Sequence, residues 1–160
     1  MKKVSTLFLR IALVLMGLVA AAVCIFALPS IHTGAAAEYP GVNILLYVFT
    51  GGLYLSAIPF FIALYQAWKL LRFIDTNQAF SQLSVSALKT IKYCGIIISI
   101  CYAACIPFLF HVAQLDDAPG LGLIALVFTC APLVISTFAA VLQKLLENAI
   151  NIKSENDLTI

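Results

Sequence analysis

The sequence YPGVNILLYVFTGGLYLSAIPFFIALYQAW occupies residues 39–68 and contains no Asp, Glu, Lys or Arg. A helix needs about 20 apolar residues to cross the ~30 Å hydrocarbon core of a bilayer, so this stretch is long enough. Lipid offers no hydrogen-bond partners, and a spanning backbone must therefore bond to itself. We predict a transmembrane helix with its membrane core at residues 43–66.

Three more stretches lack charged residues and are long enough to span: 11–37, 93–115 and 118–143. Their predicted membrane cores are residues 7–28, 93–111 and 120–142. Hydrophobic residues make up 63% of the chain and charged residues 10%, against about 45–50% and about 25% in soluble domains. A soluble domain this small could not bury that much apolar surface. The sequence predicts an all-α integral membrane protein with one four-span domain.

The basic residues predict the orientation. All nine Lys and Arg flank the same ends of the spans: Lys2, Lys3, Arg10, Lys69, Arg72, Lys89, Lys92, Lys144 and Lys153. The other two connections carry only acidic charges. Cytoplasmic loops carry the Lys and Arg excess. We therefore expect a multi-pass protein of the cell membrane with both termini, the loop 69–92 and the tail 143–160 in the cytoplasm.

A cleaved signal peptide is the alternative for the N-terminus. Lys2 and Lys3 precede an apolar run, and Ala35, Ala36 and Ala37 resemble a small-residue cleavage site. The apolar region of a signal peptide is about 7–15 residues long, and the run 11–28 is longer. We expect this segment to remain as the first span.

Short outer connections, 29–41 and 114–119, predict antiparallel neighbours and hence an up-down four-helix bundle. Asp117 is the predicted N-cap of the last span, because its side chain can accept a free backbone N–H.

The cytoplasmic segments carry the predicted docking surface. Ser81 is the predicted N-cap of the third helix, with Phe80 and Val85 as a hydrophobic staple. The last helix is expected to continue past the membrane, since an apolar stripe persists along its tail: Leu142, Leu145, Leu146, Ala149 and Ile152. The two segments are expected to project side by side, with the stripe packed on the inner loop. The alternative is that the stripe lies along the bilayer surface as an interfacial helix. The candidate partner-docking residues are Phe80, Ser81, Lys89, Lys92, Glu155, Asn156 and Asp157.

A hydroxyl-rich stripe in the second span predicts an intramembrane groove. Its candidate residues are Tyr47, Thr50, Tyr54 and Tyr65, which follow helical spacing on one face together with Gly51, Ile58 and Phe61. The alternative is a seam between helices, where small residues permit close approach and hydroxyls bond across. The seam is the more common use of such a stripe.

Candidate metal sites are few. Cys94, Cys101 and Cys105 share one helix face, but thiols in apolar helices usually serve packing. His32, Glu38, His111, Asp116 and Asp117 gather at the outer ends of the spans and form either a metal or pH-sensing site or a solvated rim. No nucleophile motif, phosphate loop or zinc signature is present, so we expect no enzyme and no cofactor. A net charge of +2 does not suggest direct nucleic-acid binding.

Two segments resemble a bacterial membrane-protein family, the YoaS-like group (domain of unknown function 2975). The inner-loop signature comprises Leu71-Arg72-Phe73-Ile74-Asp75, Ala79-Phe80-Ser81, Leu88-Lys89, Ile91-Lys92 and Gly95. The run from Ile152 to Ile160 resembles the family's tail. Family members usually have acidic residues after the Phe-Ser pair, whereas Gln82 and Leu83 follow here, which weakens an argument for charge-based docking at this loop.

The resemblance implies four transmembrane helices and a bacterial cytoplasmic membrane, with no established activity. The resemblance also implies that members of the family are frequent neighbours of small helix-turn-helix regulators. These features favour a non-enzymatic membrane regulator or anchor that holds a cytoplasmic partner such as a helix-turn-helix transcription factor. The alternative is a small-molecule carrier or an immunity-type protein that blocks a membrane-active toxin. The sequence leaves the oligomeric state open.

Overall fold

The computed structural model describes residues 2–159, and in this range the chain is entirely helical apart from short links. The helices are α1 (Lys2–Ala22), the π-helix η1 (Val23–Ala27), α2 (Leu28–Glu38), α3 (Asn43–Asp75), α4 (Gln82–Leu115) and α5 (Pro119–Leu158). Four helical segments are long and apolar enough to cross a membrane, because α1, η1 and α2 form one span from Val4 to Glu38. The predicted fold class is confirmed.

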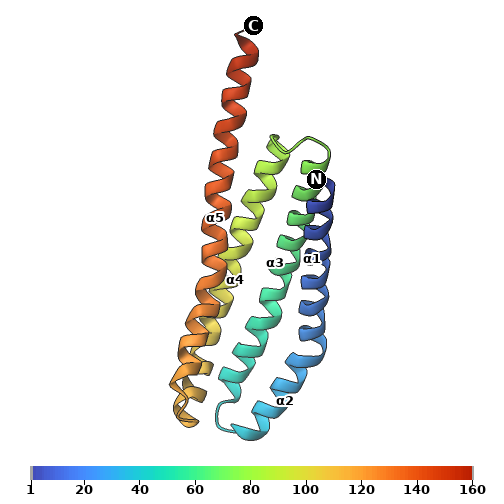
Figure 1. The fold of residues 1–160 in the computed structure, drawn as a ribbon. Helices are drawn as coiled ribbons and strands as arrows, with labels where there is room; N and C mark the ends of the chain where they lie inside the picture. Colours follow the sequence, from blue (N-terminus) through green and yellow to red (C-terminus); the bar gives the residue numbers. More distant parts are fainter. Residues whose placement is uncertain (1, 160) are drawn as a thin grey trace.

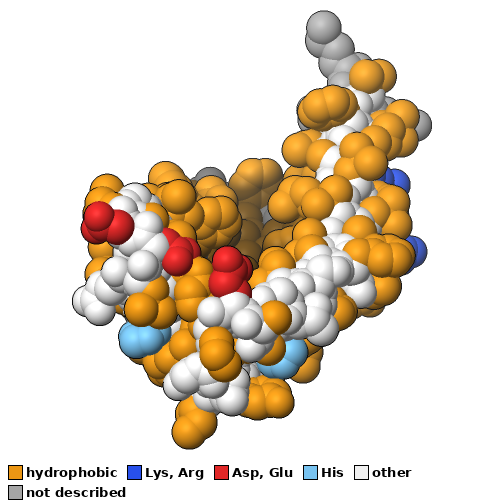
Figure 2. All heavy atoms as spheres, turned by 90° about the horizontal axis from the view of Figure 1, so that it is seen from below, with side chains coloured by type: hydrophobic (Ala, Val, Ile, Leu, Met, Phe, Trp, Pro, Cys, Tyr) orange, Lys and Arg blue, Asp and Glu red, His pale blue; other side chains and the backbone are white. Residues whose placement is uncertain are grey.

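The four spans pack mainly in chain order, with α1 on α3, α3 on α4 and α4 on α5 (Figure 1). α4 is the central helix and contributes most of the buried residues. Seen from the end that carries the α2–α3 and α4–α5 links, the molecule is hollowed in the middle (Figure 2). The bundle is therefore a curved row of helices with an apolar concave side.

The outer links differ from the prediction. The expected connection 29–41 is mostly helix, and only Tyr39–Val42 separates α2 from α3. Pro29 lies in the first turn of α2, directly after η1, and the helix continues through it. The prediction of Asp117 as an N-cap is wrong. Asp117 has a φ of 51°, and Ala118 precedes α5 without a side-chain cap.

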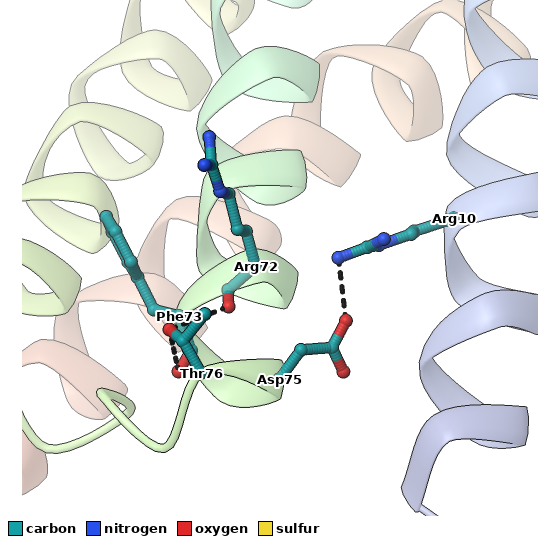
Figure 3. Close-up of polar contacts among 5 residues, drawn as sticks. All are labelled: Arg10, Arg72, Phe73, Asp75 and Thr76. Carbon is teal, nitrogen blue, oxygen red and sulfur yellow. Dashed lines mark hydrogen bonds and ion pairs between the residues drawn. The ribbon is translucent and has the colours of Figure 1, made fainter.

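The inner link follows the prediction more closely. Ser81 is extended, with a φ of −136°, and its side chain accepts a hydrogen bond from the Ser84 N–H at 3.4 Å. The predicted N-cap is confirmed. Val85 is buried, whereas Phe80 is exposed. At the end of α3 the Thr76 hydroxyl donates to the backbone carbonyls of Arg72 and Phe73 (Figure 3).

An ion pair joins α1 to the C-terminal end of α3. The Arg10 guanidinium lies 2.6 Å from the Asp75 carboxylate (Figure 3), and its Cζ lies 5.4 Å from the centre of the Trp68 ring. Both charged side chains are partly exposed, and such pairs contribute about 0.2–1 kcal/mol. The contact adds little to the stability of the fold, but it determines which part of α1 lies beside α3.

Small residues hold α4 and α5 close together. The Ser99 hydroxyl donates to the Thr129 carbonyl at 2.9 Å, and the Ser136 hydroxyl donates to the Lys92 carbonyl at 2.7 Å. Between these two bonds, a Cβ added to Gly95 would lie 2.8 Å from the Pro132 carbonyl oxygen. Only glycine permits this approach. The two helices are therefore joined by reciprocal serine-to-backbone bonds around one close contact.

The first prediction concerns orientation. In a cysteine-free background, Gly41→Cys should react with an impermeant thiol reagent added outside intact cells, because Gly41 lies in the outer link. Gln78→Cys, in the inner link, should react only after the cells are opened. Labelling of Gln78→Cys in intact cells would contradict the expected topology.

The second prediction concerns the α4–α5 contact. Gly95→Ala should destabilise the purified protein by about 1–3 kcal/mol, the usual cost of overpacking, because its methyl group meets backbone. Gly51→Ala is the matched control, since a Cβ there meets nothing within 4 Å. Thermal unfolding in one detergent measures both variants. Equal melting temperatures for the two would contradict the close contact.

Candidate functional site

The hydroxyl stripe of α3 contacts the first span. Thr50 is 7% exposed, and its hydroxyl lies 2.9 Å from Nδ1 of His32 in α2. The Tyr47 ring lies 5.2 Å from the His32 ring, centre to centre. One helical turn further on, the Tyr54 hydroxyl donates to the Cys24 carbonyl at 3.0 Å. Three of the four predicted groove residues therefore face α2 or η1.

The geometry of η1 explains why the Cys24 carbonyl accepts this bond. The Leu28 N–H donates to the Val23 carbonyl, five residues back, as in a π-helix. In this register the donor for Cys24 would be residue 29, which is proline and has no N–H. The Cys24 carbonyl is left without a helical partner, and Tyr54 supplies one from the neighbouring helix.

Tyr65 lies apart from this cluster at the inner end of α3. The Lys69 ammonium lies 5.5 Å from the centre of its ring, and the side chain is exposed. Most of the stripe thus contacts the first span, as expected for a seam between helices. The groove itself remains a prediction for these residues.

Two cavities between the spans lie on another face of α3. One, of about 260 Å³, is bounded by the first span, α3 and α4 and includes Cys24, Ser56 and Phe60. A second, also about 260 Å³, is bounded by α3, α4 and α5. Leu53 and Tyr102 line both. Sequence patterns could not identify these two residues, because isolated Leu and Tyr are ordinary in membrane helices.

The cysteines of α4 are buried, and Cys105 packs against α3. Cys94, Cys101 and Cys105 are buried, and the Cys105 thiol lies within hydrogen-bond distance of the Phe49 carbonyl, at 3.5 Å. A Cβ added to Gly52 would lie 2.8 Å from the Cys105 sulfur. A small thiol thus sits where the α3 backbone comes closest. Within residues 2–159, no three His, Cys, Asp or Glu side chains converge as metal ligands.

Asp116, one of the acidic residues at the outer ends of the spans, accepts a hydrogen bond from Tyr39. The Tyr39 hydroxyl donates to the Asp116 carboxylate at 2.5 Å and so links the α2–α3 connection to the end of α4. This bond, with smaller contributions from desolvation and from the charges of Asp116 and Glu38, raises the pKa of Tyr39 to about 12. The phenol therefore stays protonated and donating at physiological pH. His32 bonds to Thr50 instead of joining this rim.

The predicted docking residues of the inner loop lie at the start of α4. Lys89 and Phe80 are exposed, whereas the Ser81 hydroxyl is occupied as the helix cap. The Lys92 ammonium lies 4.8 Å from the centre of the Tyr93 ring and donates to Gln143 of α5 at 3.4 Å. Lys92 therefore links α4 to α5.

The tail of α5 stands clear of the loop. α5 continues past the start of α4 as one helix (Figure 1), and residues 151–159 are exposed along their whole length. Glu155, Asn156 and Asp157 lie on this projecting part. The structure thus presents the loop and the tail as two separate surfaces, where the sequence predicted a single one.

The third prediction tests the bond at η1. Tyr54→Phe should destabilise the protein by about 1 kcal/mol, because it leaves the Cys24 carbonyl without a partner in lipid. Tyr65→Phe removes the same atom where no hydrogen bond is present and should be neutral. Thermal unfolding of both variants in one detergent measures the difference. A Tyr54→Phe variant as stable as Tyr65→Phe would argue against the bond.

Comparisons with known proteins agree with the helical membrane architecture. The model of a family described as "Protein of unknown function (DUF2975)" matches residues 30–160. A Bacillus subtilis (strain 168) protein, described as "Uncharacterized membrane protein YoaS", is 54% identical over 160 residues, covering 100% of both chains. No solved structure matches. The resemblance found in the loop and tail is confirmed, and the chain belongs to the DUF2975 family.

Proposed function

We propose that this protein is a non-enzymatic membrane anchor that holds a cytoplasmic regulator at the inner face through the end of α5. The observation that supports this role is the projecting, fully exposed helix of residues 151–159. A helix of 40 residues is about 60 Å long, roughly twice the hydrocarbon thickness. A structure needed only to cross the membrane has no use for that extra length.

The charge of this projecting segment favours a basic partner. Lys153 is outnumbered by Glu155 and Asp157, and the last turn of α5 has no basic residue. The C-terminal end of a helix carries partial negative charge, so acidic side chains there are unfavourable without a cation nearby. A basic protein surface would relieve both sources of negative potential.

A helix-turn-helix transcription factor fits this description. Its DNA-binding face is basic, because it must neutralise phosphates. An acidic tail bound to that face would compete with DNA and hold the regulator at the membrane. This partner class is the one that the family resemblance implies. The mechanism requires no catalytic group and no cofactor.

The fourth prediction tests the docking role of the tail. The double variant Glu155→Gln with Asp157→Asn should bind a purified helix-turn-helix regulator about tenfold more weakly, since two charge contacts of roughly 0.7 kcal/mol each are lost. Binding is measured with the anchor in lipid nanodiscs, at two salt concentrations. Screening should weaken capture by the unaltered chain more than capture by the variant.

Glu147→Gln is the matched control. It removes a carboxylate from the same helix at the level of the bundle, where Glu147 accepts a hydrogen bond from Gln143. This variant should bind normally. If the double variant and a chain lacking residues 154–160 both capture the regulator as well as the unaltered protein does, the tail has no docking role.

The second candidate function is a small-molecule carrier, which the two cavities beside Tyr102 favour. An immunity-type protein would likewise act through its membrane-embedded surface. Removal of residues 154–160 separates these roles from the anchor. A carrier or immunity protein keeps its activity without the projecting helix, whereas the anchor loses its partner.

A further inference from the structure

α5 has two opposite faces that differ in burial. The face against α4 includes its buried residues, Gly122, Ala125, Ser136 and Ala139. Phe138 follows Ser136 by two positions, about 200° around the helix, and it is exposed. The face centred on Phe138 therefore points away from the rest of the molecule.

Residues on this free face repeat with alternating spacings of three and four. Written as heptads, the a positions are Phe128, Ile135, Leu142, Ala149 and Asn156, and the d positions are Ala131, Phe138, Leu145 and Ile152. All are exposed except Ala149, which is half-buried. An average spacing of 3.5 keeps one seam facing one partner helix and is the signature of a coiled coil. We call these nine positions the α5 seam.

The informative part of the α5 seam lies beyond Lys144. Inside the bilayer, apolar residues are expected on every face, so their spacing there says little. Past Lys144, the exposed Leu145 and Ile152 fall on the seam. The apolar residues off the seam, Leu146 and Ile150, are half-buried. Among the described apolar residues past Lys144, Leu158 alone is both exposed and off the seam.

In the part of the seam beyond Lys144, the rest of the described chain leaves Leu145, Ile152 and Asn156 exposed. α5 is one continuous helix that projects beyond the start of α4 (Figure 1), so the tail does not turn to lie along the bilayer. The seam from Leu145 to Asn156 is therefore an apolar stripe that the described chain leaves largely exposed, and such a stripe favours association.

A second copy of the chain matches the α5 seam in direction and depth. Two copies inserted in one membrane have the same orientation, so their α5 helices are parallel and their residues lie at equal depths. Each seam residue then meets its own counterpart. Asn156 occupies an a position, where a polar side chain fixes the register of a parallel pair. No other partner is matched in register by membrane insertion alone.

We propose that α5 pairs with α5 of a second copy through the α5 seam, forming a parallel two-stranded coiled coil that starts in the membrane and continues into the cytoplasm. In this pair, Ser154, Asp157 and Leu158 occupy positions away from the seam and stay accessible. The pair would present two equivalent tails related by a two-fold axis. This pairing does not depend on the proposed anchor function.

Disulfide formation along the tail tests the pairing. In a cysteine-free chain, Leu145→Cys and Ile152→Cys at d positions should give dimers when native membranes are oxidised. Glu147→Cys and Ser154→Cys, at f positions on the same helix turns, should stay monomeric. Dimers formed equally at d and f positions, or formed at none of them, would overturn the proposal.

Co-purification tests the same contact without replacing the native cysteines. Two differently tagged copies, expressed together, should purify together from detergent. Ile152→Asp should abolish this, because it places like charges opposite each other in the seam, whereas Ser154→Asp should not. Copies of the unaltered chain that never co-purify would overturn the pairing. The pairing and the anchor function are tested independently. The double variant Glu155→Gln with Asp157→Asn alters regulator binding but changes no residue of the seam.

Discussion

Lipid cannot hydrogen-bond to a polypeptide, and this constraint determines where the hydroxyl groups of this protein lie. At three places a side-chain hydroxyl bonds to a backbone carbonyl of a neighbouring helix. Tyr54 does so at η1, where Pro29 and the π-turn leave the Cys24 carbonyl free. Ser99 and Ser136 do so across the α4–α5 contact. These bonds also place the helices, because each needs one particular rotation and depth of its neighbour.

The spans consequently differ in how firmly they are held. α4 is buried on two sides and meets α3 and α5 through small residues, Gly52 against Cys105 and Gly95 against Pro132. α1 has few buried side chains, and the Arg10–Asp75 ion pair is one of its contacts with α3. Partly exposed ion pairs are weak. The first span is therefore less deeply packed than α4, and one of the two cavities that share Tyr102 opens beside it.

Hydrophobic length and charge position sufficed to predict the four spans, because both depend only on composition along the chain. Ser81 was predictable because an N-cap is a local bond. Sequence reasoning failed where two local preferences competed. Pro29 suggested the end of a helix, yet the π-turn carries the helix past it to Glu38. Asp117 suggested a cap, yet its left-handed backbone, with a φ of 51°, turns the chain before α5 begins.

For the candidate sites too, sequence patterns indicated local structure but not which distant segments lie side by side. The α3 stripe was visible in the sequence, but its role depended on which helix lies beside it, and no local pattern specifies that neighbour. The tail stripe was also visible, and its amphipathic pattern correctly indicated that the last helix continues through the tail. Whether that stripe lay on the inner loop depended on the relative lengths of α4 and α5. Because α5 continues beyond the start of α4, its exposed seam and acidic end project together from the rest of the described chain.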